Sequence, residues 1–258
     1  MMAHAPNWIG LEGVVNVRDV GGLPASDGHR IRPGVLIRSA NLSFITEADV
    51  ARLVDELGVR RVLDLRTDVE VRHSEPGLLH GRDGITFHNL SLYPDGVSET
   101  DSPDPVAPWV GERFSDDRNP QVTSYLRYLQ RRPDSIVAAL RAIAEPDGAT
   151  VVHCAAGKDR TGMVIALALS VAGVPREMIA ADYAQTQSQI MAILEQLAGN
   201  DLYDLDATKP EQVPPASAET MLGVLAAIDA DYGGVLSWLT EHGWSDSDTE
   251  RLRAKLLD

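Results

Sequence analysis

The sequence predicts an α/β fold with a mostly parallel central sheet flanked by helices and a helical C-terminal part. Short β-branched runs alternate with helix-like segments over the first 150 residues, as in βαβ units. After residue 161 every structured segment has a helical pattern. The chain has 258 residues, of which 44% are hydrophobic, so it is long enough to bury one large core. We therefore expect a single domain over residues 1–258.

The predicted elements follow in chain order. A helix is expected to start at Thr46, because Asp49 three residues later gives a capping-box-like start, and Gly58 is expected to end it. Strands are expected where aliphatic and β-branched residues cluster, at 14–15, 35–37, 59–65, near 85–92 and from 149. The remaining helices are expected at 121–130, 135–145, 162–169, 175–187, 190–198, 216–229, 235–242 and 246–257.

Residues 93–120 interrupt this alternation. They contain five prolines and seven carboxylates. A structureless segment of this length in a compact domain is usually a functional loop or a disordered insertion. Because it precedes the motif described below, we expect an active-site lid with Trp109 and Phe114 as apolar anchors. A mobile insertion without a role is the alternative.

Composition limits the class of protein. The net charge of −15 makes nucleic acid an unfavourable partner. A single cysteine forbids an intrachain disulfide and fits a reducing compartment. Residues 1–10 lack the basic and apolar regions of a signal peptide, and the longest apolar run is too short to span a bilayer. We expect a cytoplasmic protein without stable membrane association. Export without a conventional signal peptide, and the oligomeric state, stay open.

The most informative run is His-Cys-Ala-Ala-Gly-Lys-Asp-Arg-Thr at residues 153–161, which contains the only cysteine. A strand-like run precedes it and an apolar helical run follows it, so we expect a strand–loop–helix turn. Loop N–H groups and a helix N-terminus would then point toward one spot. Such a site binds a dianion and favours a thiolate, which is the nucleophilic form of cysteine.

Each residue type suits attack on a phosphate ester. Cys154 is the predicted nucleophile, and the planar fork of Arg160 fits two phosphate oxygens in a way that lysine cannot imitate. Thr161 can donate its hydroxyl to the sulfur, and His153 is expected to fix the loop by hydrogen bonds. Predicted phosphate-binding residues are Ala155, Ala156, Gly157, Lys158, Asp159 and Arg160. A buried core cysteine beside an unrelated arginine is the alternative, which the matching His, Gly and Thr disfavour.

The leaving group needs a proton, which a nearby carboxylic acid can supply. Asp159 lies inside the loop, beside Arg160. Asp95 follows a predicted strand end and could be brought in by the adjacent segment. Either could instead be structural, Asp159 as a partner of Lys158 and Asp95 as a turn residue. Lys158 itself could favour polyanionic substrates or form a solvated ion pair.

The motif resembles that of the cysteine-dependent protein-tyrosine phosphatase superfamily, in its bacterial tyrosine/serine phosphatase branch. Three further segments are similar to that branch: Asn16–Gly22, Leu36–Ser43 and Val62–Arg66. The resemblance implies hydrolysis of phosphomonoesters through a phosphocysteine. Phosphotyrosine is the leading substrate, with phosphoserine, phosphothreonine and phosphoinositides also considered. It favours Asp159 as the acid, although a Pro-Asp similar to Pro94-Asp95 also occurs in the branch. Structural ion pairs are expected among Arg18, Asp19, Arg38, Asp64 and Arg66.

Two other functions are considered. A rhodanese-like sulfurtransferase also starts an anion-binding turn with cysteine, but the flanking His153 and Thr161 and the Cys-to-Arg spacing argue against it. A catalytically inactive phosphate-binding module is disfavoured because nucleophile, arginine and candidate acids are all present. The other histidines show no metal-ligand spacing, so neither a metal nor another cofactor is expected.

Overall fold

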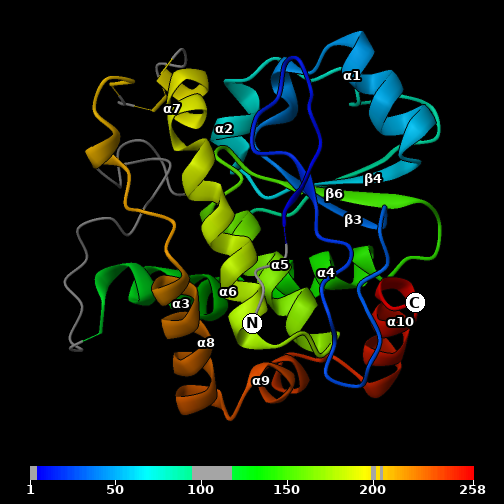
Figure 1. Cartoon of the computed structure of the whole chain (residues 1–258), viewed down its shortest axis with the longest axis vertical. Coiled ribbons are helices and arrows are strands. Elements are labelled where there is room, and N and C mark those ends of the chain that lie inside the picture. The colour runs from blue at the N-terminus through cyan, green and yellow to red at the C-terminus, as the bar shows by residue number, and fades with distance from the viewer. Residues whose placement is uncertain (1–4, 95–117, 199–201, 204–205) are drawn as a thin grey trace.

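A six-stranded sheet forms the centre of the computed structural model, which describes residues 5–94, 118–198, 202–203 and 206–258 (Figure 1). The strands lie in the order β1-β2-β3-β6-β4-β5. Strands β3, β6, β4 and β5 pair in parallel, and β1 and β2 add antiparallel at one edge, which confirms the mostly parallel sheet. The strands are β1 (Asn7–Trp8), β2 (Arg18–Asp19), β3 (Leu36–Ser39), β4 (Val59–Asp64), β5 (Thr86–Asn89) and β6 (Ala149–His153).

Strand β6 lies in the middle of the sheet, between β3 and β4. Its Val151 pairs with Ile37 on one side and with Val62 on the other. All five residues of β6 are buried, as expected for a parallel strand that is covered on both faces. The chain that follows β6 therefore starts at the centre of the sheet's carboxyl edge.

Helices cover both faces of the sheet, as predicted (Figure 1). On one face, α1 and the π-helical turn after it pack Val50 and Leu53 against Val62. On the other face, Leu63 and Val152 belong to a core that also contains residues of α3, α4, α5, α6, α8, α9 and α10. The α-helices are α1 (Glu47–Ala51), α2 (Asp68–Arg72), α3 (Pro120–Arg131), α4 (Pro133–Ile143), α5 (Asp159–Val171), α6 (Arg176–Gln185), α7 (Ile190–Ala198), α8 (Ala218–Tyr232), α9 (Val235–Glu241) and α10 (Asp246–Leu256). Shorter helical turns are η1 (Leu42–Phe44), η2 (Arg52–Glu56), η3 (Thr186–Gln189) and η4 (Pro210–Gln212).

The first predicted helix has the expected ends. The Thr46 hydroxyl accepts the N–H of Asp49, and the Asp49 carboxylate accepts the N–H of Thr46, which completes a capping box. Gly58 after the helical segment has φ +65°, a left-handed conformation that favours glycine. Both signals are local in sequence, which is why the pattern predicts them.

The two antiparallel strands and helix α2 differ from the predictions. Residues 14–15 form no strand, and the nearby residues that pair are Arg18 and Asp19 of β2, between the unpredicted edge strand β1 and β3. Helix α2 was not predicted, because five residues are too few to show an apolar period. Its one sequence signal is a second capping box between Thr67 and Glu70.

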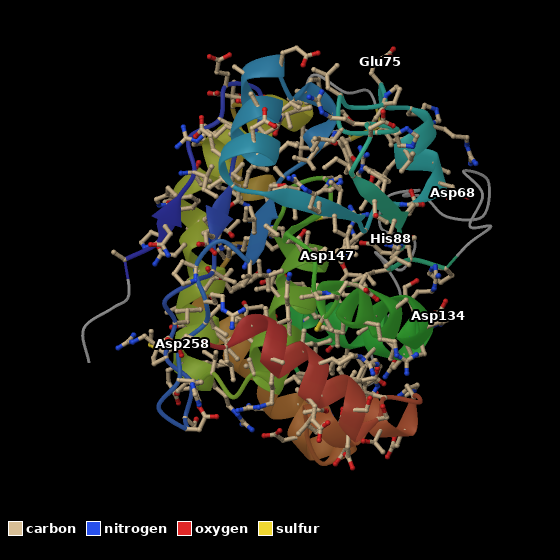
Figure 2. The ribbon with its side chains drawn as sticks, turned by 90° about the vertical axis from the view of Figure 1, so that its right-hand side faces the viewer. Asp68, Glu75, His88, Asp134, Asp147 and Asp258 are labelled. Carbon is tan, nitrogen blue, oxygen red and sulfur yellow. The ribbon has the colours of Figure 1, made fainter. Side chains whose placement is uncertain are left out.

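The exterior of the molecule carries much of its negative charge. Figure 2 shows exposed acidic side chains on separate parts of the surface, among them Asp68, Glu75, Asp134, Asp147 and Asp258. In the part of the chain that the structure describes, no single helix has the length and apolarity to cross a membrane. The bent pair of α8 and α9 meets that criterion by length and composition only.

Candidate active site

Cys154 lies directly after β6, and α5 begins at Asp159, so the predicted strand–loop–helix turn is confirmed. We call residues 154–158 the Cys154 loop. The carboxyl edge of a parallel sheet is a common place for ligands. The N-terminus of α5 adds N–H groups without helical partners and a positive partial charge. Cys154 is only 2% exposed, so a substrate must reach into the site.

The carbonyl oxygens of the Cys154 loop are tied to the scaffold around it. The N–H and C=O of a trans peptide point in opposite directions. Carbonyls held against the scaffold therefore turn the next N–H groups toward the other side, the arrangement from which backbone anion-binding concavities are built. The donors are the Asn41 N–H to Ala155 (2.9 Å), Asn16 Nδ2 to Ala156 (3.0 Å) and Arg38 Nη2 to Gly157 (2.9 Å).

Gly157 is required at its position in the loop. Its φ is +66°, and a Cβ there would lie 2.3 Å from the carbonyl oxygen of Ser39. Both the left-handed conformation and the close approach to β3 exclude a side chain. The predicted role of Gly157 in shaping the loop therefore has a steric basis.

A largely buried carboxylate holds the two arginines beneath the loop. Asp182 of α6 accepts Arg18 Nε at 2.9 Å and Arg38 Nη1 at 2.6 Å. Burial would raise the pKa of Asp182, but the two guanidinium charges outweigh it and lower the pKa. Burial and the charge of Arg38 lower the pKa of Arg18 to about 10. Arg18 and Arg38 thus form ion pairs as predicted, whereas Asp19 bonds the N–H groups of residues 21 and 34.

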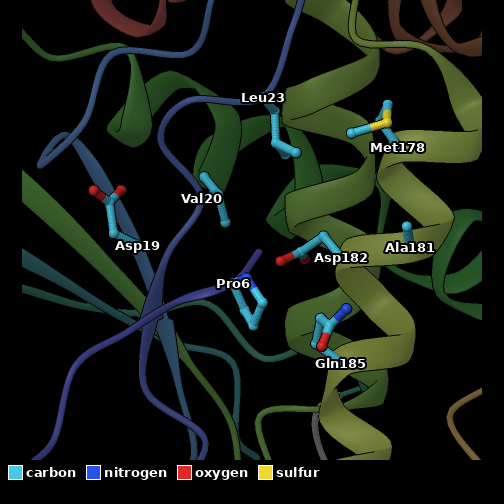
Figure 3. Close-up of a pocket in the computed structure, with 8 residues that line it drawn as sticks. All are labelled: Pro6, Asp19, Val20, Leu23, Met178, Ala181, Asp182 and Gln185. Carbon is cyan, nitrogen blue, oxygen red and sulfur yellow. The ribbon is translucent and has the colours of Figure 1, made fainter. Parts of the chain in front are cut away.

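A small cavity of about 10 Å³ lies beside this carboxylate (Figure 3). Asp182 and Gln185 of α6 face Pro6, Val20 and Leu23 across it. No residue of the Cys154 loop lines it. It is therefore separate from the Cys154 loop.

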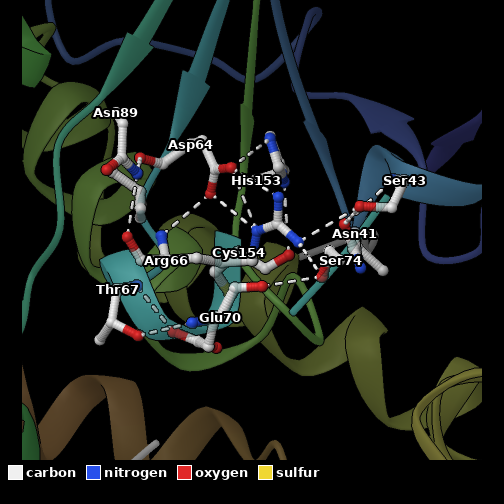
Figure 4. A network of polar contacts seen from close by, with 12 residues as sticks. Asn41, Ser43, Asp64, Arg66, Thr67, Glu70, Ser74, Asn89, His153 and Cys154 are labelled. Atoms are coloured by element: carbon white, nitrogen blue, oxygen red, sulfur yellow. Dashed lines mark hydrogen bonds and ion pairs between the residues drawn. The ribbon is translucent and has the colours of Figure 1, made fainter. Parts of the chain in front are cut away.

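His153 is buried at the end of β6, beside the pair formed by Asp64 and Arg66 (Figure 4). Arg66 Nη2 lies 2.7 Å from Asp64 Oδ2, which confirms this predicted ion pair. Burial lowers the pKa of His153 to about 4, and the Asp64 carboxylate only partly offsets it. His153 is thus neutral near pH 7, as suits a residue that fixes the loop through Nδ1, 3.4 Å from the Cys154 carbonyl.

Arg160 is fixed by a carboxylate that the sequence did not single out. Glu70 of α2 accepts Arg160 Nη1 at 2.5 Å and Nη2 at 2.8 Å. It also accepts the Thr67 N–H at 2.8 Å and the Tyr203 hydroxyl at 2.9 Å. Burial would raise the pKa of Glu70, but the Arg160 charge and these donors hold it below its usual range. Its only sequence signal is the capping box, which marks a helix start and gives no hint of Arg160.

Asp159 is held by a tyrosine and a lysine. The Tyr125 hydroxyl donates to Asp159 Oδ1, and the Tyr183 hydroxyl lies 2.6 Å from that of Tyr125. Lys158 Nζ lies 3.4 Å from the same Oδ1 and donates to the carbonyl of Pro214 at 2.5 Å. The Lys158 side chain is only 3% exposed, so the alternative of a solvated ion pair is wrong.

The other predicted site residues lie in the core beside the loop or outside the described residues. Thr161 is fully buried near the start of α5, and its hydroxyl has no hydrogen-bond partner in the part of the chain that is described. Ala155 and Ala156 pack against Ile193 and its neighbours around α7. Asp95 and most of the predicted lid at 93–120 lie outside the described residues. Within the described ranges, no group of three or more His, Cys, Asp or Glu side chains is placed to hold a metal ion.

Comparison with known proteins agrees with the fold. A model of the tyrosine phosphatase family matches residues 9–258. The chain therefore belongs to the tyrosine phosphatase family and is a phosphatase, which confirms the resemblance found in the motif.

Among its relatives is the triple specificity protein phosphatase PtpB of Mycobacterium tuberculosis. The two are 32% identical over 96% of this chain and 98% of PtpB. A tyrosine-protein phosphatase of Nostoc commune is 29% identical over 90% of this chain and 78% of its own length. The likeness spans nearly the whole chain, well beyond the motif at residues 153–161.

Proposed function

We propose that this phosphatase hydrolyses phosphotyrosine and related phosphomonoesters through a phosphocysteine at Cys154. One observation carries the proposal. The only cysteine of the chain begins a loop whose carbonyls are tied outward, at the N-terminus of a helix that also supplies Arg160. This arrangement places a nucleophile beside N–H groups and a guanidinium that suit a phosphate dianion.

The first step forms a sulfur–phosphorus bond. The Cys154 thiolate attacks phosphorus, the ester P–O bond breaks, and Asp159 gives its proton to the departing oxygen. In the second step a water molecule attacks phosphorus, its proton passes to Asp159, and the P–S bond breaks to release phosphate. The Thr161 hydroxyl is proposed to donate to the leaving sulfur. Asp95 remains the alternative acid.

Arg160 is proposed to hold the phosphate while Glu70 holds Arg160. A guanidinium has five N–H donors. Two of them bond to Glu70, at 2.5 and 2.8 Å, which leaves others for phosphate oxygens. A fork that is already oriented loses little further entropy when it binds substrate.

Substrate breadth is part of the proposal. Aryl phosphates have the best leaving groups, which puts phosphotyrosine first. The printed name of the mycobacterial relative, with its triple specificity, supports testing phosphoserine, phosphothreonine and phosphoinositides as well. Lys158 gives phosphoinositides no special support, because its ammonium is engaged by Pro214 and Asp159.

The test compares kcat/KM for a phosphotyrosine peptide, a phosphoserine peptide and a phosphoinositide, with wild type and Cys154→Ser. We expect the phosphotyrosine peptide to be the best substrate. Cys154→Ser should abolish turnover and still bind vanadate, because the loop and Arg160 supply the binding. Loss of only a few-fold in rate would rule out the covalent mechanism. Thiosulfate:cyanide sulfurtransferase activity in the wild type would instead support the rhodanese-like alternative.

A further inference from the structure

A chain of two buried tyrosines ends on the carboxyl group of Asp159. Tyr125 comes from α3 and Tyr183 from α6, while Asp159 is the first residue of α5. Both phenol rings are nearly fully buried, and they meet edge to face with centroids 6.2 Å apart. Side chains of three helices are therefore linked through the Tyr125 hydroxyl, which joins Tyr183 to the proposed general acid.

The position of Tyr183 is fixed by close packing. A Cβ on Gly162 in α5 would lie 2.9 Å from Cδ2 of the Tyr183 ring. Glycine here lets the ring lie against the first turn of the helix that begins with Asp159. The Tyr183 ring therefore packs directly against the backbone of α5, which limits its movement.

The direction of the hydrogen bonds follows from the proton count. A phenol has one proton, and that of Tyr125 is donated to Asp159 Oδ1. The Tyr125 oxygen must then accept, so Tyr183 donates to Tyr125 over their 2.6 Å contact. Burial and the nearby Asp159 charge raise the pKa of both phenols, so both keep their protons at working pH.

These contacts make the two oxygens of Asp159 unequal. Oδ1 receives the Tyr125 hydroxyl and lies 3.4 Å from Lys158 Nζ. Oδ2 has no polar partner among the described residues, and the side chain is 34% exposed. A proton on Oδ1 would compete with two donors for the same oxygen, so the protonated acid carries its proton on Oδ2.

We propose that Tyr125, oriented by Tyr183, is a positioning residue that keeps the acidic proton of Asp159 on Oδ2, the oxygen available to the leaving group. This inference rests on the proposed role of Asp159 as general acid. It gives Tyr125 an effect on the proton-donating step that its packing alone would not have.

The test is the ratio of kcat/KM values for a nitrophenyl phosphate and an alkyl phosphate, because kcat/KM reports the first step, in which only the poor leaving group needs the proton. Tyr125→Phe should lower kcat/KM for the alkyl phosphate about three- to tenfold, the effect of one lost hydrogen bond to a neutral carboxylic acid. The nitrophenyl phosphate and vanadate affinity should change little. Tyr183→Phe should shift the ratio the same way by a smaller factor.

The matched control is Tyr128→Phe, three residues further along α3. It removes a buried hydroxyl that lies 3.3 Å from that of Tyr93, whereas the hydrogen bond to Asp159 comes from Tyr125. Its effects should be equal for the two substrates. In an Asp159→Asn background, Tyr125→Phe should not change the ratio further, because the two residues act in one step.

The outcomes separate this inference from the proposed function. If Asp159→Asn changes the ratio and Tyr125→Phe does not, the positioning role is refuted and the acid assignment stands. If Tyr125→Phe still changes the ratio in the Asp159→Asn background, it acts on another group and the inference is wrong. If Asp159→Asn leaves the ratio unchanged, both the acid assignment and the inference fall, and Asp95 becomes the acid to test.

Discussion

Replacing Glu70 with glutamine should destabilise the whole protein and weaken its phosphate site. Glu70 is fully buried and the Arg160 side chain is 6% exposed, so solvent cannot screen the charge that remains. Removing one partner of such a buried pair typically destabilises by about 3–5 kcal/mol. A protein of this size loses about 2–4 °C in melting temperature per kcal/mol, so we expect a decrease of about 10 °C.

The measurement is urea and thermal unfolding of wild type and Glu70→Gln, followed by kcat and vanadate affinity below the melting range. Asp68→Asn is the control in the same helix, because its pair with Arg72 is 3.9 Å long and exposed on both sides. The control should change stability by less than about 1 kcal/mol. A Glu70→Gln melting temperature within about 2 °C of wild type would refute the view that the pair is tightly coupled and buried.

Three further outcomes are expected. Arg160→Lys should lower kcat/KM about 100- to 1,000-fold, because a point charge cannot make the bidentate contact; a loss below about tenfold in steady-state kinetics would contradict this. Gly157→Ala should destabilise by about 1–3 kcal/mol in urea and weaken vanadate binding, whereas Gly28→Ala, at φ +92° in open space, should affect stability alone. His153 has its pKa lowered to about 4 by burial, so the unfolded chain takes up this proton first. Its contribution to stability is complete above pH 6.5 and is lost at about 1.4 kcal/mol per unit as pH falls toward 4. Urea unfolding of His153→Asn at several pH values should show a free energy of unfolding that changes less steeply with pH in that window.

Local signals account for what the sequence predicted correctly. The strand, loop and helix around Cys154 follow from contiguous residues: a β-branched run, a glycine and an apolar helical run. The capping box of Thr46 and Asp49 is equally local. The predictions of secondary structure failed where an element is too short to show a pattern, as for the two-residue strand at Arg18 and the five-residue helix α2. Short elements are fixed by the neighbours they pack against, and these are not adjacent in sequence.

The sequence by itself determined the phosphatase class and the strand–loop–helix turn, and it predicted the nucleophile and the phosphate-binding residues, since these need residues at fixed spacing within one turn of chain. Only the tertiary structure decided which groups support them. Glu70 meets Arg160 across 90 residues, and Asp182 meets Arg38 across 144. Tyr125 reaches Asp159 from a different helix. No periodicity or motif links such positions. They come together because burying the apolar faces of separate helices on one sheet brings their polar side chains to the same carboxyl edge, where each buried charge must find a partner.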